Sequence, residues 1–341
     1  MNILFIGEIN SGSRGLQRLN SLLELGHKVT TVNLGPIALP YLKLKLLNLT
    51  YKLGYPYDVL KVNQQVIDFA SNNKYDYVWV DKALVLKPST LKKVMRLQPE
   101  VKILMYTEDN LFLKHNQSKY FLSCVKYFDL FVTTKSENLE STEPIRKDIR
   151  KIFFVNNSYD ENIHKPSLKE WPKRFRNEVL FIGSYEPIRA ASIAHIAEGG
   201  VPVTIWGDGW KSFSHASHKN IKLHGKGLRG EDYADEVFNS RISLCFLRKA
   251  NHDLQTARSV EIPACGGFML AEDTDEHRAL FENDKEAVYF TSNEDLLGKV
   301  IKYLNNEEKR LDISKRARER CLDSEYSHKD MINLIINELE Q

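Results

Sequence analysis

Residues 2–7 read Asn-Ile-Leu-Phe-Ile-Gly, and residues 178–183 read Glu-Val-Leu-Phe-Ile-Gly. Each is a short apolar run that ends at a glycine, which is typical of a strand buried on both faces of a parallel sheet. After the first run come a polar turn, leucines at helical spacing that stop at Gly26, and a second strand at 28–33. This order predicts the β-turn-α-β unit of a doubly wound sheet. Because the second run starts the pattern again, the sequence predicts two Rossmann-like domains in tandem, an α/β fold.

The remaining strands and the domain limits follow from the same patterns. Further strands are predicted at 76–80, 101–106, 130–133, 152–155 and 203–206. The composition changes between residues 156 and 175, where Trp171-Pro172 and other loop residues indicate a linker. We therefore expect domains at 1–165 and 166–325. A final helix, within 326–341, is a candidate to cross back to the first domain.

Bulk composition points to an ordinary globular protein. The chain has 341 residues, of which 42% are hydrophobic and 27% charged. Its first residues are too short an apolar stretch for a signal peptide, and no run reaches the roughly 18 residues of a membrane span. A cytoplasmic location is therefore expected. The four cysteines are far apart, so reduced thiols are expected in place of a zinc site or disulfides, at Cys124, Cys245, Cys265 and Cys321.

Charge is unevenly distributed along the chain. Residues 1–170 hold 24 Lys and Arg against 17 Asp and Glu, a net charge of +7, whereas the remainder has a net charge of −4. A basic half attracts anionic acceptors or a membrane surface, although a solvated lysine-rich surface explains it as well. Within this half, residues 41–57 alternate lysines and leucines. The segment is interpreted as a helix that either contacts an anionic membrane peripherally or packs against the core of the first domain.

Two common nucleotide sites are excluded by spacing. Gly7, Gly12 and Gly15 are separated by four and then two residues, which is not the Gly-x-Gly-x-x-Gly of dinucleotide binding. No acidic residue ends the second strand, where Asn33 stands. With no Walker A loop either, nicotinamide, flavin and kinase chemistry are not expected.

The stretch from Asn251 to Leu270 carries the chemistry. A polar loop leads to Thr256 or Ser259 as an N-cap, and a short helix is predicted from Arg258 to Cys265. At the carboxyl edge of a parallel sheet, the amide groups and dipole of such a helix bind anions, and a diphosphate fits.

Two side chains of this helix have a predicted role. Arg258 adds a positive charge, and Glu261 can accept hydrogen bonds from the two ribose hydroxyls. The alternative is a plain ion pair between these two residues, one helical turn apart.

Here a resemblance to a known family becomes specific. Residues 261–267, Glu-Ile-Pro-Ala-Cys-Gly-Gly, resemble the donor-site helix of group 1 glycosyltransferases. Three more stretches resemble the CgeB-like, spore-maturation branch of that superfamily, at Phe181–Arg189, Trp206–Trp210 and Arg241–Arg248. The likeness covers about 175–330 and is weaker in the first domain.

The resemblance implies a GT-B fold, with two Rossmann-like domains facing across a cleft. It implies a hexosyltransferase-like enzyme that binds its acceptor in the first domain and a nucleotide-sugar in the second, without a metal or other cofactor. The family places two glutamates, separated by seven intervening residues, in the donor site. Here Glu261 matches the second, and Asp253, a shorter acid, stands at the first. The presence of Asp253 in place of a glutamate also favours an alternative, a catalytically silent module that binds a nucleotide-sugar or glycan.

The predicted donor-binding residues come from four places in the second domain. They are Gly183, Ser184, Arg189, Trp206, Gly207, Gly209, Arg248, Thr256, Ser259 and Glu261. Fixed positive groups among them would stabilise the leaving diphosphate. Each has a plainer interpretation: the glycines make tight turns, Trp206 packs in the core, and Arg189 lies on a helix surface.

The acceptor side and the catalytic groups complete the prediction. The polar turn after the first strand supplies the acceptor-binding candidates Glu8, Ser11, Gly12, Ser13 and Arg14. The catalytic candidates are Asp253, Arg258, Glu108 and Asp109. Adjacent carboxylates after a strand suit a general base or hydroxyl binding, and also a simple turn cap. The acceptor is expected to be a glycan, a lipid-linked molecule or another hydroxyl compound. Transfer to DNA bases is a further alternative, but nucleic acid is not expected because no Arg-aromatic patch is visible.

Overall fold

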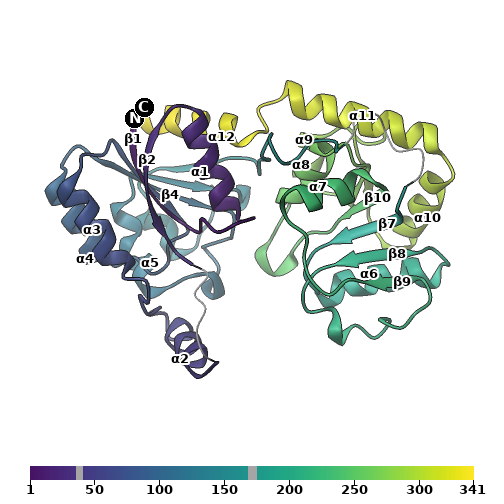
Figure 1. The fold of residues 1–341 in the computed structure, drawn as a ribbon, viewed down its shortest axis with the longest axis horizontal. Coiled ribbons are helices and arrows are strands. Elements are labelled where there is room, and N and C mark those ends of the chain that lie inside the picture. The colour runs from purple at the N-terminus through teal and green to yellow at the C-terminus, as the bar shows by residue number, and fades with distance from the viewer. Residues whose placement is uncertain (36–40, 168–174) are drawn as a thin grey trace. The chain divides into compact units, whose positions relative to one another are not determined.

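The computed structural model describes residues 1–35, 41–167 and 175–341, with only the backbone of 41–46. The chain divides into two compact units (Figure 1). Unit 1 is Met1–Asn156 together with His328–Gln341, and unit 2 is Asn157–Ser327. Trp171 and Pro172, in the predicted linker, lie outside the described residues.

Unit 1 is built on a six-stranded parallel sheet. Its order is β2-β1-β3-β4-β5-β6. The strands are β1 Asn2–Gly7, β2 Lys28–Asn33, β3 Tyr77–Asp81, β4 Lys102–Thr107, β5 Leu130–Thr133 and β6 Ile152–Phe154. The α-helices are α1 Arg14–Glu24, α2 Tyr41–Lys52, α3 Val62–Asn72, α4 Pro88–Leu97, α5 Lys119–Cys124 and α12 His328–Glu340.

Alternation along the strands divides the core of unit 1 into two layers. Leu4 and Ile6 of β1 face one cluster, which contains residues of α3, α4 and α5. Ile3 and Phe5 face the other, which contains residues of α1 and α12. Successive side chains of a strand point to opposite faces, so one apolar run fills both layers.

Helix α12 belongs to unit 1 although it lies at the far end of the sequence. Its apolar stripe, which includes Ile332 and Ile335, is buried in the α1 layer. Polar contacts anchor it to the sheet: the Tyr77 hydroxyl donates to Glu340 at 2.9 Å, and the Lys102 amine to the Leu339 carbonyl at 2.7 Å. The last helix is thus part of the fold of the first unit.

Unit 2 repeats the architecture with another six-stranded parallel sheet. Its order is β12-β11-β10-β7-β8-β9. The strands are β7 Asn177–Ile182, β8 Val203–Trp206, β9 Ile221–Leu223, β10 Ser240–Cys245, β11 Met269–Glu272 and β12 Val288–Phe290. The α-helices are α6 Pro187–Glu198, α7 Gly230–Phe238, α8 Ala257–Ala264, α9 Asp275–Leu280, α10 Asn293–Leu304 and α11 Glu307–Asp323.

The first unit ends earlier than the expected residue 165. Asn157 donates its backbone N–H to Gln255 at 2.9 Å, and the Tyr159 hydroxyl donates to the Cys321 carbonyl at 3.1 Å. Tyr159 also bridges Ser327 in a parallel β-bridge. Buried hydrogen bonds therefore place residues 157–165 in unit 2, where the sequence suggested the end of the first domain.

Two general features complete the fold. All four cysteines are buried and free. Across the described ranges, no helix is both long enough and apolar enough to span a bilayer.

Burial of the α12 stripe predicts how strongly unit 1 depends on it. Ile335→Ala removes a fully buried side chain and should lower the free energy of unfolding by about 2–5 kcal/mol, because it leaves a cavity. Leu334→Ala, at the exposed neighbouring position, should change it by only about 0.5 kcal/mol. Urea unfolding of both variants checks this. Equal losses would show that α12 does not hold the layer.

Candidate functional site

In unit 2 the predicted donor residues gather where the sheet reverses its winding. From β7 the chain adds β8 and β9 on one side, and then β10, β11 and β12 on the other. The crevice outside the carboxyl ends of β7 and β10 is the usual ligand position in such sheets. Gly183 and Ser184 follow β7, whereas Arg248 and Asp253 follow β10. One edge of the sheet therefore collects them.

Helix α8 begins at this edge with a complete cap. Thr256 is the N-cap residue, and its hydroxyl accepts from the Arg258 N–H at 3.2 Å. The Ser259 hydroxyl in return accepts from the Thr256 N–H at 2.9 Å, which completes a capping box. The cap therefore fixes the orientation of the backbone amides in the first turn of α8.

A buried histidine ties this cap to the sheet. His277, fully buried at the start of α9, contacts the Glu272 carbonyl through Nδ1 at 2.6 Å and the Ser259 hydroxyl through Nε2 at 2.7 Å. Since a carbonyl only accepts, Nδ1 carries the proton and Nε2 accepts from Ser259. Burial lowers the pKa of His277 below its ordinary value. The side chain of Ser259 therefore serves the cap, and its role in donor binding stays a prediction.

Arg258 and Glu261 form an ion pair on α8. The Glu261 carboxylate is only 2% exposed, whereas the Arg258 side chain is 34% exposed. Burial alone would lower the pKa of Arg258, but the Glu261 charge raises it well above its ordinary value. The guanidinium also lies 4.2 Å from the centre of the Tyr233 ring.

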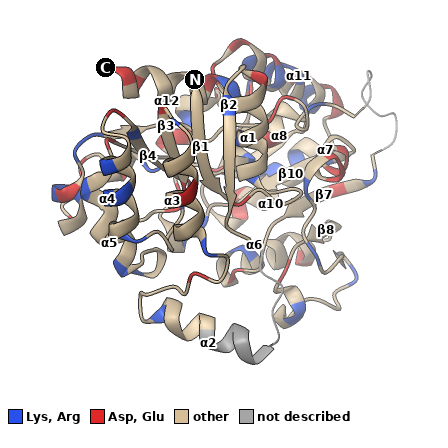
Figure 2. Cartoon of the chain, turned by 60° about the vertical axis from the view of Figure 1, so that its left-hand side comes forward, with Lys and Arg blue, Asp and Glu red and all other residues tan. Residues whose placement is uncertain are grey.

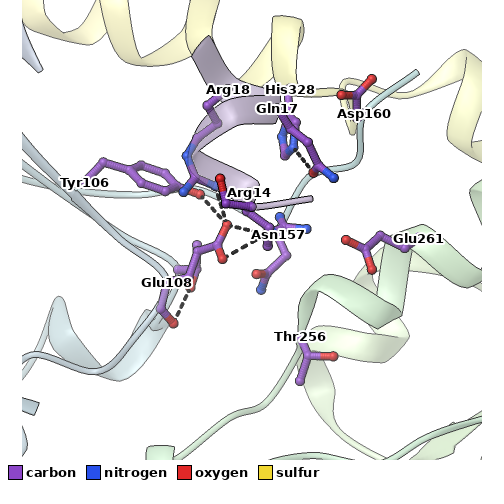
Figure 3. A network of polar contacts seen from close by, with 12 residues as sticks. Arg14, Gln17, Arg18, Tyr106, Glu108, Asn157, Asp160, Thr256, Glu261 and His328 are labelled. Carbon is purple, nitrogen blue, oxygen red and sulfur yellow. Dashed lines mark hydrogen bonds and ion pairs between the residues drawn. The ribbon is translucent and has the colours of Figure 1, made fainter. Parts of the chain in front are cut away.

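A histidine approaches the same carboxylate from the segment before β7. His164 is buried, and its Nδ1 accepts from the Asp160 N–H at 3.0 Å. Its Nε2 lies 3.7 Å from Glu261 Oε1. Arg258 and His164 therefore both contact the Glu261 carboxylate. Figure 3 shows Glu261 and Thr256 on the α8 segment.

The turn after β7 is shaped by close packing against the turn after β8. The Trp210 indole N–H donates to the Gly183 carbonyl at 2.9 Å. A Cβ on Gly207 would meet the same Gly183 oxygen at 1.9 Å, so only glycine fits there. Gly209, with φ of 84°, makes the turn itself. Trp206, which is partly exposed, stacks on His224 with the ring centres 3.7 Å apart.

Glu186 joins the two remaining arginines. Its carboxylate lies 3.6 Å from Arg189 and 3.4 Å from Arg248. Arg189 also donates to the Ser184 carbonyl at 3.3 Å. Asp253, nearby, accepts from the Asn251 amide at 2.7 Å and is 8% exposed. Two positive groups are therefore held at the turn, although both already contact a carboxylate.

Unit 1 has a cavity at its own winding reversal, between β1 and β3. Its volume is about 460 Å³. Among the predicted acceptor residues, Glu8, Ser13 and Arg14 line it. Ser11 and Gly12, in the turn before α1, are not among its lining residues. The Ser13 hydroxyl caps α1 and donates to the Glu8 carbonyl at 2.8 Å.

Two arginines that line this cavity, Arg14 and Arg18, belong to a charge cluster with Glu108, which is not itself a lining residue (Figure 3). Arg18 donates two hydrogen bonds to Asp81, at 2.7 and 2.9 Å, and a third to Glu108 at 2.7 Å. Arg14 donates a hydrogen bond to Glu108 at 2.8 Å. The Tyr106 hydroxyl also donates to Glu108, at 3.3 Å. Asp109, the residue after Glu108, forms an ion pair with Lys82.

The cluster decides what Glu108 can do. Burial alone would raise the pKa of its carboxyl, but the charges and hydrogen bonds of Arg14 and Arg18 lower it to about 2. A carboxylate with so low a pKa is a weak base near neutral pH. It can still accept hydrogen bonds. The sequence left three roles open for Glu108, a general base, hydroxyl binding and a turn cap, and the low pKa argues against the first.

Several residues at these two edges were missed by the sequence reasoning. They are Arg18, Tyr51, Asp81 and Lys82 in unit 1, and His164, Glu186 and His277 in unit 2. Asp81 and Lys82 end or follow a predicted strand, so the rule that selected Glu108 would also have found them. Lys82 and His252, one at each edge, have positive φ values of 47° and 53°, as strained residues at sites often do.

No metal cluster accompanies the site. Within the described part of the chain, no three His, Cys, Asp or Glu side chains are arranged to hold an ion. Independence from metals stays a prediction.

Comparison with protein families gives one match. Residues 188–337, most of unit 2 and all of α8, match the model described as Glycosyl transferase-like. No curated protein matches the sequence.

Solved structures resemble the whole chain. A glycosyltransferase from Rickettsia africae has a TM-score of 0.67 at 13% identity, with 99% of this chain and 97% of that chain covered. Anabaena Alr3699/HepE, solved with UDP and glucose, has a TM-score of 0.63 at 14% identity, with 100% and 99% covered. These likenesses establish the predicted fold class, the α/β GT-B fold with two Rossmann-like units.

One similar protein is longer. TarM of S. aureus has a TM-score of 0.56 at 15% identity over 82% of this chain, but the chain spans only 58% of its length.

The environment of His277 predicts a pH dependence of stability. Because its pKa is lower in the folded protein than the ordinary 6.5, the unfolded chain binds the proton first as the pH falls. The contribution of neutral His277 to the free energy of unfolding is therefore complete above about pH 6.5. It declines as the pH drops through that value. Urea unfolding at about pH 8 and about pH 5.5 measures the decline. His277→Gln should reduce it, whereas the exposed His115→Gln should not. An unchanged pH dependence in His277→Gln would contradict the assignment.

Proposed function

We propose that this protein is a glycosyltransferase that moves a sugar from a nucleotide-sugar, bound by unit 2, to a hydroxyl acceptor bound by unit 1. The observation that carries the proposal is the capped N-terminus of α8, with Arg258 and Glu261 on its first turns, at the winding reversal of unit 2. The family match over 188–337 and the fold shared with Alr3699/HepE, solved with UDP-glucose, support it.

Donor binding would exchange existing contacts for contacts to the ligand. The diphosphate would take up the α8 amides and the Arg258 guanidinium, which is the more exposed partner of the pair. Glu261 would then accept hydrogen bonds from the ribose hydroxyls in place of Arg258. Arg189 and Arg248 would exchange Glu186 for phosphate in the same way.

The transfer needs a leaving group and a proton acceptor. The acceptor oxygen forms a bond to the anomeric carbon, the bond from that carbon to the diphosphate oxygen breaks, and the electron pair leaves with the diphosphate. Fixed positive groups stabilise that charge without a metal. The acceptor hydroxyl loses its proton to a base, for which Asp109 and Asp253 are the candidates. Glu108, held by two arginines, is assigned to acceptor binding.

The cavity of unit 1 supports a proposal for the acceptor class. The charged side chains beside it form ion pairs with one another. They therefore present hydrogen-bond donors and acceptors without a large net charge. Such side chains suit the hydroxyl groups of a glycan, free or lipid-linked. A hexose donor and a cytoplasmic location remain predictions.

Calorimetric titration with UDP, GDP, dTDP and CMP tests the proposal. Binding of one nucleotide, followed by hydrolysis of its sugar over hours or transfer to a glycan, is the expected result. Binding without turnover across an acceptor panel would instead favour the silent module, which the shorter Asp253 permits. No binding of any nucleotide would refute the transferase and the nucleotide-sugar module, and would leave only a module that binds a glycan.

Glu261→Gln sharpens the test. The substitution keeps the shape of the side chain but removes its charge, and hydrogen bonds to charged groups contribute about 1.5–3 kcal/mol. Nucleotide affinity should fall roughly 10-fold to 100-fold. Glu319→Gln, on the exposed face of α11, is the matched control and should bind as the wild type does. If both variants bind equally well, Glu261 serves only its ion pair.

A further inference from the structure

Large apolar side chains are exposed on neighbouring segments of unit 1. They are Leu49, Leu53, Tyr55, Tyr57 and Leu122. Tyr57 is 69% exposed and Leu53 is 59% exposed. They come from the end of α2, the loop after it and α5, all in the same unit (Figure 1). Single exposed apolar residues are normal, but a contiguous group marks an interaction surface.

Direct contacts make these segments one surface. The Gly54 carbonyl accepts from the Lys119 N–H at 2.7 Å, which joins the loop to the start of α5. The rings of Tyr55 and Tyr120 meet edge to face, with centres 5.4 Å apart. The Lys119 amine lies 4.9 Å from the centre of the Tyr55 ring.

Lysines surround the apolar group. They are Lys52, Lys61, Lys87, Lys114 and Lys119, all exposed. Together with the five apolar residues they form what we call the lysine–tyrosine face. In the described segments 47–64 and 114–122 the only carboxylate is Asp58, which accepts from the Val62 and Asn63 N–H groups at 2.7 and 2.9 Å. Figure 2 shows Lys and Arg on α2, α4 and α5.

We propose that the lysine–tyrosine face binds the surface of an anionic lipid bilayer. Tyrosine rings and leucines enter the boundary between headgroups and acyl chains, whereas lysines remain among the phosphates. Apolar burial and a basic cluster are the two contributions that stable peripheral binding requires. Exposed leucines gain nothing from nucleic acid, and the cations of this face are lysines, which do not form the forked contacts of arginine.

The face adjoins the cavity of unit 1. Tyr51 lines that cavity and also the groove formed with Lys52, Leu53 and Lys119. Binding at this face would therefore bring the cavity to the headgroup region. If the cavity takes the acceptor, a step that rests on the proposed function, the acceptor is a molecule carried by a lipid.

Flotation of the full chain with vesicles tests the face without any nucleotide. Binding to phosphatidylcholine vesicles that contain about 30% phosphatidylglycerol should exceed binding to pure phosphatidylcholine at least tenfold, through the anionic surface. Raising NaCl from about 0.1 M to about 1 M shortens the Debye length from about 10 Å to about 3 Å. Binding to the anionic vesicles should therefore weaken. The double variant Leu53→Glu, Tyr57→Glu should lose most of the binding.

The control moves the same change to another surface. Ile301→Glu with Leu322→Glu replaces exposed apolar residues of unit 2, at 44% and 60% exposure, and should bind vesicles as the wild type does. Equal losses in both double variants, or no preference for anionic vesicles, would overturn the proposal. Tighter binding of a fluorescent oligonucleotide than of vesicles would overturn it as well. Nucleotide titration of the Leu53→Glu, Tyr57→Glu variant should match the wild type, so failure here leaves the proposed transfer reaction standing.

Discussion

In each unit, the chain leaves its first strand in one direction across the sheet and later returns to add strands on the other side. Crossovers between parallel strands are right-handed, so this reversal sends the connecting helices to opposite faces and leaves the loops at the reversal without a helix between them. In unit 1 these loops carry Glu8, Ser13 and Lys82, and in unit 2 they carry Ser184 and Arg248. The candidate sites depend on this one topological constraint.

Both edges hold their charges in pairs. Arg18 is 4% exposed and bonds Asp81 and Glu108, while Glu261 is 2% exposed and pairs with Arg258. A buried charge without a partner is costly, so each group is held where its partner lies. The consequences differ between the units. The paired charges of unit 1 are fixed by their mutual hydrogen bonds, whereas the pair of unit 2 has one member, Arg258, whose side chain is 34% exposed.

The position of α8 shows how local and distant contacts combine. Its cap is local, since Thr256 and Ser259 bond each other. Its attachment to the sheet is not local, because His277 reaches Ser259 from α9 and holds Glu272 at the end of β11. The position of the first turn depends on both, since the cap orients its amides and the histidine fixes them relative to the strands.

The sequence by itself determined the long elements of this protein and the residues of α8. Continuous apolar runs and helical leucine spacing are local properties, so β1, β2, β5 and β8 lie where they were predicted, and the short helix is displaced by one residue. Of the three-residue strands, β6 was predicted, whereas β9 and β12 were missed, because so few residues carry little periodicity. Only the tertiary structure decided which residues contact one another across the fold. Arg18 meets Asp81 from 63 positions away, because chain crossovers bring together residues whose spacing in the sequence contains no sign of contact. The return of the last helix to unit 1 was a candidate from the sequence, but its contacts with α1 and the sheet were not.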